Sequence, residues 1–281
     1  MAITAEILAQ VGAVPRLAAV VPASGLEVRP APEMVSTGIP QLDSLTGGFP
    51  RGCLTEICGT ASSGRTSVLL CALARATQRG EVCALVDASN AFDPASAANA
   101  GMEMNRLLWV RCGKLVPGSQ FSVLSSLPKH NFGNSREFNP ARRVSESRLE
   151  QVLKVADLLL QSNGFGMIAL DLGDIPPASA RRIPLASWFR FRRAIEHTPT
   201  ALLVLEQQPI AGSCSSVLLK LSAVSSQLSG KPPTHTVLPH AELLDQFEIT
   251  VELLRSRLER NSGKKPAQST TSFISRAAWT G

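Results

Sequence analysis

The sequence predicts an α/β fold in which a mostly parallel, twisted sheet carries helices on both faces and ends in an antiparallel hairpin. Three observations indicate this class. Apolar runs of strand length alternate with segments of helical periodicity, a glycine-rich loop joins one such strand to one such helix, and two further strand-like segments near the C-terminus flank a turn. Strands that alternate with helices form parallel sheets with both faces covered. The 281 residues suffice for one large α/β core or at most two domains.

The individual elements follow from the hydrophobic pattern. Strands of the parallel part are expected at residues 54–58, 82–87, 107–110, 167–171 and 201–207. Helices are expected between these strands, at residues 67–74, 149–160 and 183–197. The antiparallel hairpin is expected at residues 247–254 and 271–275, with a turn at 263–266.

The chain is expected to divide into an N-terminal arm or linker at 1–35 and a core at 36–281. The arm combines a short apolar helical pattern with a proline-rich run between Pro22 and Pro32, which is typical of a linker. Within the core, residues 113–147 lose all periodicity and are rich in Ser, Asn, Pro and basic side chains. Structureless loops of this length are usually functional or disordered, so we expect a mobile basic insertion here.

Composition argues against several classes of protein. No apolar run approaches the roughly 20 residues of a membrane span, and the N-terminus lacks the basic start of a secretory signal. The six cysteines form no CxxC pair, and several lie in apolar runs, so a zinc or redox site is not expected. These observations predict a protein of the reducing cytoplasm without membrane contact.

Basic charge is concentrated in the second half of the chain. Residues 1–112 hold 8 basic and 9 acidic side chains, whereas residues 113–281 hold 20 basic and 13 acidic ones. Such an excess suits contact with nucleic acid or with an acidic partner, and a solvated face is the alternative. The candidate contact residues are Arg181, Arg182, Arg190 and Arg193.

The helix expected at 183–197 has an aromatic face. Trp188 and Phe191 fall on one side of it, whereas Arg190 and Arg193 point away. An amphipathic helix that packs its aromatic side chains on the sheet is the favoured interpretation. The arginines would still be exposed and could meet phosphates or an acidic partner.

The glycine-rich loop has the pattern of a phosphate-binding site: glycine, four residues, glycine, a basic residue and a hydroxyl. Backbone N–H groups curl around a phosphate in such a loop, and the following helix adds the positive end of its dipole. The position where such loops usually have lysine holds Arg65, whose planar guanidinium is bulkier and prefers bidentate contacts. We therefore expect a nucleotide site, with ATP as the candidate ligand, that need not hydrolyse it. The candidate binding residues are Gly59, Thr60, Ala61, Ser62, Ser63, Gly64, Arg65, Thr66 and Ser67.

Three polar side chains stand at the ends of other predicted strands: Asp87, Asp171 and Gln207. Ligands of open parallel sheets bind at the carboxyl ends of the strands, so these side chains are expected to converge near the loop. Asp171 is the candidate ligand of Mg²⁺, together with the hydroxyl of Thr66. A turn or helix-capping role is the alternative for Asp171.

Several segments between residues 36 and 94 resemble the RecA recombinase family. Residues 36–43 are similar to the family's STG-x-x-x-LD, and residues 48–57 are similar to its GG-x-P-x-G-x-x-x-EI. The loop at 59–66 aligns with GPESSGKT, and residues 83–94 align with CAFIDAEHALDP. A weaker resemblance continues through Asp171 and the strand ending in Gln207, which is similar to LIFINQ. The resemblance implies a RecA-like core that binds ATP with Mg²⁺, and it makes Gln207 the residue that senses the terminal phosphate.

The departures from the family bear on its chemistry. The loop lysine is Arg65, and Ser89 stands where the family has the glutamate that orients the attacking water. We therefore name no catalytic residue. The segments at 172–182 and 209–216 are shorter than the family's DNA-binding loops. No counterpart is recognised for its C-terminal domain or for most of its filament-forming N-terminal element.

This pattern of losses resembles the ImuA group, which comprises RecA-like accessory proteins of damage-induced, error-prone DNA synthesis in bacteria. The resemblance implies a role in the SOS response, with a Y-family polymerase-like protein and a replicative-type polymerase as partners and single-stranded DNA as a further candidate. The alternative is an ATP-dependent recombinase of DNA repair that binds single-stranded DNA.

Overall fold

The chain divides into two compact units, Met1–Ala31 and Pro32–Gly281. The computed structural model describes residues 31–112, 140–224, 246–258 and 269–276, together with five positions between 7 and 14. The boundary lies slightly before the one expected at residue 35. The reason is that Met34–Val35 (β1) pairs antiparallel with Phe49–Pro50 (β2) of the second unit.

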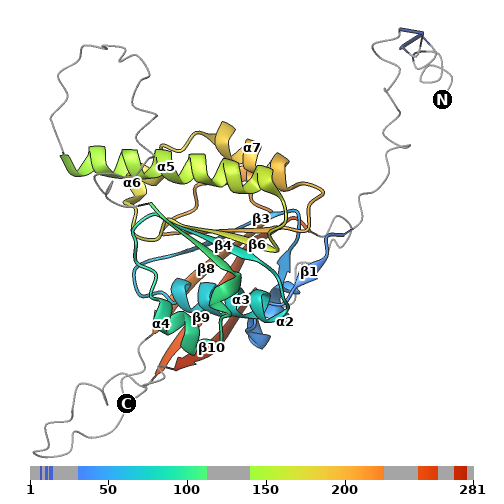
Figure 1. Cartoon of the computed structure of the whole chain (residues 1–281). Coiled ribbons are helices and arrows are strands. Elements are labelled where there is room, and N and C mark those ends of the chain that lie inside the picture. The colour runs from blue at the N-terminus through green and yellow to red at the C-terminus, as the bar shows by residue number, and fades with distance from the viewer. Residues whose placement is uncertain are drawn as a thin grey trace, which may run out of the picture. The chain divides into compact units, whose positions relative to one another are not determined.

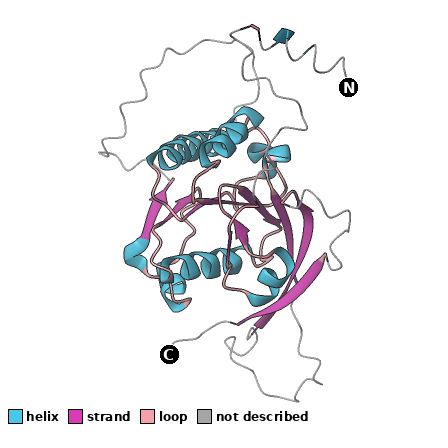
Figure 2. Ribbon diagram, turned by 90° about the vertical axis from the view of Figure 1, so that its right-hand side faces the viewer, coloured by secondary structure: helices cyan, strands magenta, loops and turns pink. Residues whose placement is uncertain are grey.

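A single mixed sheet forms the centre of the second unit. Its strands are β3 (Leu54–Gly59), β4 (Cys83–Asp87), β5 (Leu107–Arg111), β6 (Met167–Asp171), β7 (Ala201–Glu206), β8 (Val217–Val224), β9 (Gln246–Ser256) and β10 (Thr270–Arg276). Their order is β10-β9-β8-β3-β7-β6-β4-β5. The strands from β8 to β5 in this order are parallel, whereas β9 and β10 join antiparallel (Figure 1, Figure 2). This arrangement confirms the predicted fold class.

Helices cover both faces of the sheet, as Figure 1 shows. On one face lie α2 (Pro40–Thr46), α3 (Arg65–Gln78) and α4 (Pro94–Asn99). On the other lie α5 (Pro140–Ser162), α6 (Pro177–Ala180) and α7 (Leu185–Ile195). Within the described residues, no helix combines the length and the apolar character needed to cross a membrane.

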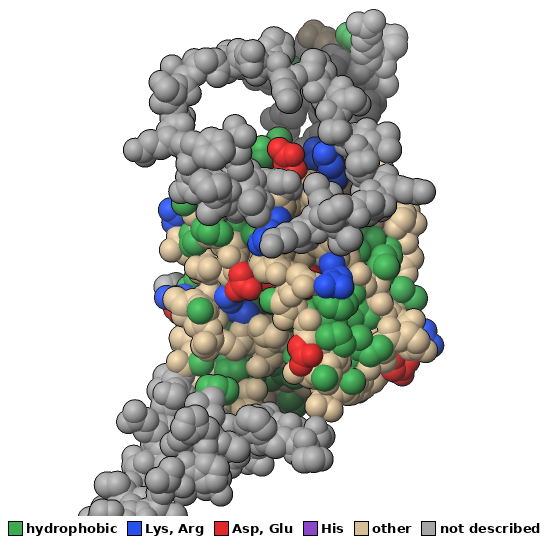
Figure 3. All heavy atoms as spheres, turned by 60° about the vertical axis from the view of Figure 1, so that its left-hand side comes forward, with side chains coloured by type: hydrophobic (Ala, Val, Ile, Leu, Met, Phe, Trp, Pro, Cys, Tyr) green, Lys and Arg blue, Asp and Glu red, His purple; other side chains and the backbone are tan. Residues whose placement is uncertain are grey.

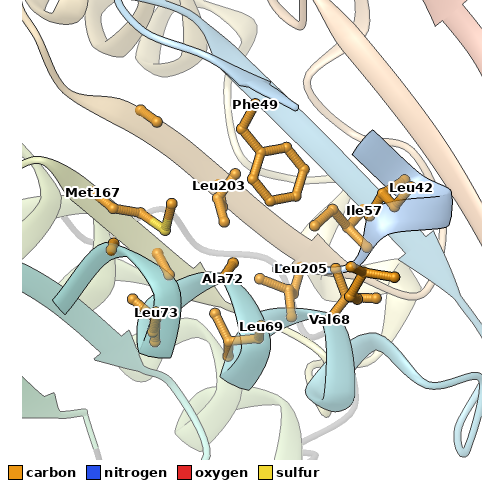
Figure 4. Packing of buried hydrophobic residues seen from close by; sticks show 14 of the residues in the cluster. Leu42, Phe49, Ile57, Val68, Leu69, Ala72, Leu73, Met167, Leu203 and Leu205 are labelled. Atoms are coloured by element: carbon orange, nitrogen blue, oxygen red, sulfur yellow. The ribbon is translucent and has the colours of Figure 1, made fainter. Parts of the chain in front are cut away.

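The helix α3, which follows the glycine-rich loop, is anchored by an apolar core. One side of α3 is buried against Phe49, Ile57 and the α3-facing side chains of β6 and β7 (Figure 4). The buried side chains of α3 in this view are Val68, Leu69, Ala72 and Leu73. Because this packing fixes the helix, it also fixes the loop at its N-terminus.

The opposite face of the sheet is covered by α5 and α7. Trp188 and Phe191 of α7 are fully buried, and their rings meet edge to face with centroids 5.8 Å apart. The interpretation of α7 as an amphipathic helix with its aromatic side chains on the sheet is therefore confirmed for these two residues. Phe189 is different, because it is half exposed on the outer face of the helix.

Two elements differ from the sequence-based expectation. The strand β8 was not predicted, because Lys220 and Ser222, which are exposed, interrupt its apolar pattern. Helix α5 begins at Pro140, so residues 140–147, which were expected to be irregular, are helical. The remainder of the expected basic insertion, 113–139, lies outside the described residues, as does the expected turn at 263–266.

Candidate functional site

The loop between β3 and α3 has a shape that requires its two glycines. Gly64 has a φ of 90°, and Ser62 also adopts the left-handed conformation with a φ of 59°. A Cβ atom on Gly59 would collide with Ser63 and with the carbonyl group of Leu221. A Cβ atom on Gly64 would collide with the side chain of Ile249. The loop is thus closely enclosed by its own residues and by β8 and β9.

The N-terminus of α3 is suited to an anion. It has no side-chain cap and no acidic residue in its first turn, so its terminal N–H groups and dipole are available to a phosphate. Ser63 is 2% exposed, and its hydroxyl has no hydrogen-bond partner among the described residues. A buried hydroxyl normally has one. An uncapped helix start beside an unpartnered hydroxyl therefore fits a bound phosphate.

Two cavities lie near the start of α3. One of about 260 Å³ is lined by the loop itself and by Ala223, Phe247 and Ile249. A larger one of about 990 Å³ extends between α2, α3, α4 and the β9–β10 hairpin, and both include Ser67 in their walls.

Arg65 reaches away from the loop to the segment after β6. Its Nη1 and Nη2 atoms donate to the carbonyl oxygen of Gly173 at 3.4 and 3.3 Å. The amide nitrogen of Gln207 donates to the same oxygen at 3.0 Å. A Cβ atom on Gly173 would lie 3.1 Å from Nη1 of Arg65, so the missing side chain leaves room for the guanidinium. Two of the predicted site residues therefore converge on one backbone carbonyl.

Asp171 lies at the end of β6, opposite Asp87 in the register of β4 and β6. Its carboxylate accepts a hydrogen bond of 2.9 Å from the N–H of Gly173, which is the turn role named as the alternative. Burial raises the pKa of Asp171 above its ordinary value, although the Gly173 hydrogen bond and the Arg65 cation act in the opposite direction. Thr66 is exposed at the start of α3. The role of these two residues as Mg²⁺ ligands stays a prediction.

Asp87 shapes the turn that carries Ser89. Its carboxylate, which is 1% exposed, accepts hydrogen bonds from the backbone N–H groups of Ser89, Ala91 and Phe92 and from the indole N–H of Trp109. Four donors occupy the lone pairs of this carboxylate. Asp87 is therefore committed to the fold of the turn, and the side chain that the turn presents at the expected catalytic position is a serine hydroxyl.

A pair of buried carboxyl groups was missed by the sequence analysis. Glu56 of β3 is fully buried and accepts hydrogen bonds of 2.8 and 2.6 Å from the N–H groups of Ile210 and Ala211. Glu206 of β7 is 1% exposed. Burial, together with the neighbouring charge of Glu56, raises the pKa of Glu206 well above its ordinary value. The sequence did hold an indication, since Glu56 lies within a largely apolar strand and Glu206 ends another one.

Arg255 of β9 completes this network. Its Nη2 atom lies 3.4 Å from Glu56 and donates to the carbonyl of Gly212 and the hydroxyl of Ser215, both at 2.7 Å. Together, Glu56 and Arg255 bind both ends of the segment 210–215. The loop after β7 is therefore held against the sheet by charged hydrogen bonds.

The four candidate contact arginines do not form one group. Arg190 makes a two-pronged ion pair with Asp157 of α5, at 2.7 and 2.6 Å, so part of its capacity for phosphate is already used. Arg181 bonds to the side chain of Gln208, beside the predicted sensor. Arg182 and Arg193 are exposed. On the face drawn in Figure 3, basic and acidic side chains of the described residues are interspersed.

Sequence comparisons find similarity between this chain and RecA proteins. Residues 18–114 match the profile of the RecA N-terminal domain. Protein RecA of Chlorobaculum parvum is 50% identical over 76 residues, which cover 26% of this chain and 22% of that protein. Protein RecA of Kineococcus radiotolerans is 28% identical over 200 residues, which cover 65% of this chain and 47% of that protein. The chain thus spans between about a fifth and about half of the length of these relatives.

A solved structure shows the same fold. The crystal structure of the RadB recombinase superposes with a TM-score of 0.52 and 18% sequence identity, covering 87% of this chain and 100% of that one. At this level of identity the likeness concerns the fold alone.

Proposed function

Since the profile match, the curated relatives and the shared fold support an assignment to the RecA family, we propose that this chain is a RecA-like accessory protein of the bacterial DNA-damage response. In this proposal it supports error-prone translesion synthesis in the manner of the ImuA group. It binds nucleotide without efficient turnover and acts through protein contacts in the cytoplasm. The observation that carries the proposal concerns two residues. The side chain of Arg65 is hydrogen-bonded to the carbonyl of Gly173, and Ser89 has no carboxylate that could act as a general base.

The site retains the means to bind phosphate. The loop backbone, the uncapped start of α3 and the unpartnered hydroxyl of Ser63 fit the phosphates of ATP. Arg65 supplies a permanent positive charge, and Thr66 and Asp171 are the residues that would hold Mg²⁺. Mg²⁺ supplies charge neutralisation to a bound triphosphate. Burial raises the pKa of Asp171, whereas the cation of Arg65 acts to lower it, so this cation would also disfavour Mg²⁺ at that carboxylate.

Hydrolysis needs a group that orients and deprotonates water. Loss of a positioned general base typically costs about 10²–10⁴-fold in rate. Ser89 cannot supply a carboxylate, and Asp87, two residues earlier, is occupied by four N–H donors. Turnover should therefore be slow even when ATP is bound.

The loop after β7 supports the same view. In the resembled family, the residue at the position of Gln207 passes the state of the nucleotide to the DNA-binding loops. Here the following segment is short, and Glu56 and Arg255 hold it at both ends. A loop fixed in this way is poorly suited to a large nucleotide-driven movement. The partners proposed by resemblance, a Y-family polymerase-like protein and a replicative-type polymerase, would then do the work on DNA.

The second candidate function is an active recombinase. The direct connection of Gln207 to the Gly173 carbonyl, and through it to the loop arginine, favours this candidate because it links the sensor to the phosphate site. The two functions differ in turnover, which can be measured on the full chain with and without single-stranded DNA. The accessory role predicts nucleotide binding by calorimetry with hydrolysis far below 1 per second. DNA-stimulated hydrolysis at about 1 per second or faster, an ordinary enzymatic rate, would decide for the recombinase.

A second measurement tests assembly. The accessory role predicts discrete particles in electron micrographs of the protein with ATP and single-stranded DNA. Long regular filaments would contradict it, because they require a repeated head-to-tail interface that propagates.

A further inference from the structure

The outer face of α7 exposes two large apolar side chains. Leu185 is 54% exposed and Phe189 is 49% exposed, one helical turn apart. They lie opposite the buried side of the helix, which carries Trp188, Phe191 and Ile195. A Cβ atom added to Gly212 would lie 3.5 Å from Cδ2 of Leu185, so Leu185 lies near the loop after β7.

The border of this surface is basic. Residues 175–195 contain five arginines and no acidic residue. Arg192 and Arg193 are exposed at the C-terminal end of α7, and Arg181 precedes the helix. Arg190 is turned to Asp157 and leaves the apolar pair uncovered. The centre of the surface is thus apolar, and the exposed Arg192 and Arg193 lie near its C-terminal end, where Glu196 follows as the C-cap of α7.

The surface is also rigid before any partner arrives. Trp188 and Phe191 are buried in the core between α7 and the sheet, and the Arg190–Asp157 ion pair holds α7 against α5. A preorganised surface loses little conformational freedom on binding. Exposed apolar side chains on such a frame are the usual anchors of a protein interface, with charged residues at the rim.

We propose that the outer face of α7, formed by Leu185, Phe189 and the flanking Arg192 and Arg193, docks an acidic segment of a protein partner that inserts apolar side chains between them. Charge complementarity selects an acidic partner, because the exposed arginines attract acidic side chains and repel basic surfaces. The aliphatic Leu185 favours protein over nucleic acid, since bases can stack on an aromatic side chain such as Phe189 but not on a leucine. This surface lies on the opposite face of the sheet from α3, so the proposal stands whether or not nucleotide is hydrolysed (Figure 1).

The test uses the full chain and a phage-displayed library of random 16-residue peptides. Selection on the wild-type protein should enrich peptides that combine Asp and Glu with Leu, Phe or Trp. The strongest peptide is then synthesised and its Kd measured by fluorescence anisotropy. The double variant Leu185→Ser/Phe189→Ser should weaken binding at least tenfold, and Arg192→Glu/Arg193→Glu should do the same. Leu158→Ser, which changes an exposed leucine of α5, is the matched control and should leave the Kd unchanged.

Circular dichroism and thermal unfolding of each variant establish that it folds; the changed side chains are exposed, so folding should persist. The proposal is overturned if selection gives no acidic, apolar consensus, or if the selected peptide binds the double variant as well as the wild type. It is also overturned if the double variant instead abolishes binding of a single-stranded oligonucleotide, which would make the surface a nucleic-acid site. Dimerisation of the wild type that the double variant abolishes would assign the surface to a second copy of this chain and likewise contradict the proposal.

Discussion

The guanidinium of Arg65 donates two hydrogen bonds to the carbonyl oxygen of Gly173, from Nη2 at 3.3 Å and from Nη1 at 3.4 Å. This contact joins the glycine-rich loop to the segment after β6, 108 residues later in the chain. The planar fork of an arginine can donate twice to one oxygen, whereas an ammonium group presents a single compact charge. An arginine at this position is therefore larger than the usual lysine, and it also joins the loop to the segment after β6.

Substitutions at two positions of the site should increase ATP hydrolysis. The double variant Arg65→Lys/Ser89→Glu restores a compact cation and a carboxylate, and we expect it to raise ATP turnover at least tenfold, since a general base contributes about 10²–10⁴-fold. Steady-state phosphate release measures this. Arg65→Lys/Ser89→Gln has nearly the same shape without the carboxylate and should stay at the wild-type rate. Equal rates for the two double variants would show that catalysis was lost elsewhere.

Glu206 should make the protein less stable as the pH rises. Its raised pKa means that the folded protein holds this proton when the unfolded chain has lost it. Above about pH 4.3, the ordinary pKa of Glu, stability therefore falls, by up to about 1.4 kcal/mol per pH unit, until the folded group ionises. Glu206→Gln cannot ionise and should be more stable than the wild type at pH 7, with the difference shrinking towards pH 4. Urea unfolding at several pH values measures it, and the exposed Glu252→Gln should show no such trend.

Arg255 lies on β9 and Arg257 directly follows this strand, so the effects of replacing each arginine on stability can be compared. The side chain of Arg255 contacts Glu56, Gly212 and Ser215, whereas the side chain of Arg257 donates to the carbonyl of Ser213. Removing one partner of a buried charge is strongly destabilising, and partial exposure of Arg255 reduces the effect. We expect Arg255→Ala to lower the free energy of unfolding by about 2–3 kcal/mol.

Arg257→Ala should cost less than about 1 kcal/mol, as is usual at exposed sites. Hydrogen exchange gives an independent readout, because the amides of Ile210 and Ala211 lose protection if the loop is released. Similar losses in the two variants would contradict the role assigned to Arg255.

Neighbouring aromatic residues of α7 should behave in opposite ways. Trp188 is fully buried, so Trp188→Ala leaves a cavity and should cost about 3–5 kcal/mol. Phe189 is half exposed, and Phe189→Ala should change stability by less than about 1 kcal/mol. Chemical denaturation separates the two outcomes. A large loss at Phe189 would mean that its role is internal packing, and it would weaken the case for the α7 docking surface.

The sequence alone determined the fold class, the glycine-rich loop between β3 and α3 and the amphipathic character of α7, because each rests on short-range patterns. Glycine spacing, strand-length apolar runs and the helical placement of Trp188 and Phe191 are readable within about ten residues. It also determined that Asp87, Asp171 and Gln207 stand at strand ends, since parallel strands end at one edge. Their approximate convergence followed from that rule.

Only the tertiary structure decided what these side chains contact. The Arg65–Gly173 contact and the hydrogen bond from Ala211 to Glu56 join residues 108 and 155 positions apart, and no local pattern specifies such pairs. Burial decided the state of Glu206, because the same carboxyl on a surface strand would keep its ordinary pKa. Pairing decided β8, whose mixed pattern becomes a strand only between β3 and β9. Side-chain chemistry is carried by the sequence, whereas proximity and desolvation arise from the packed fold.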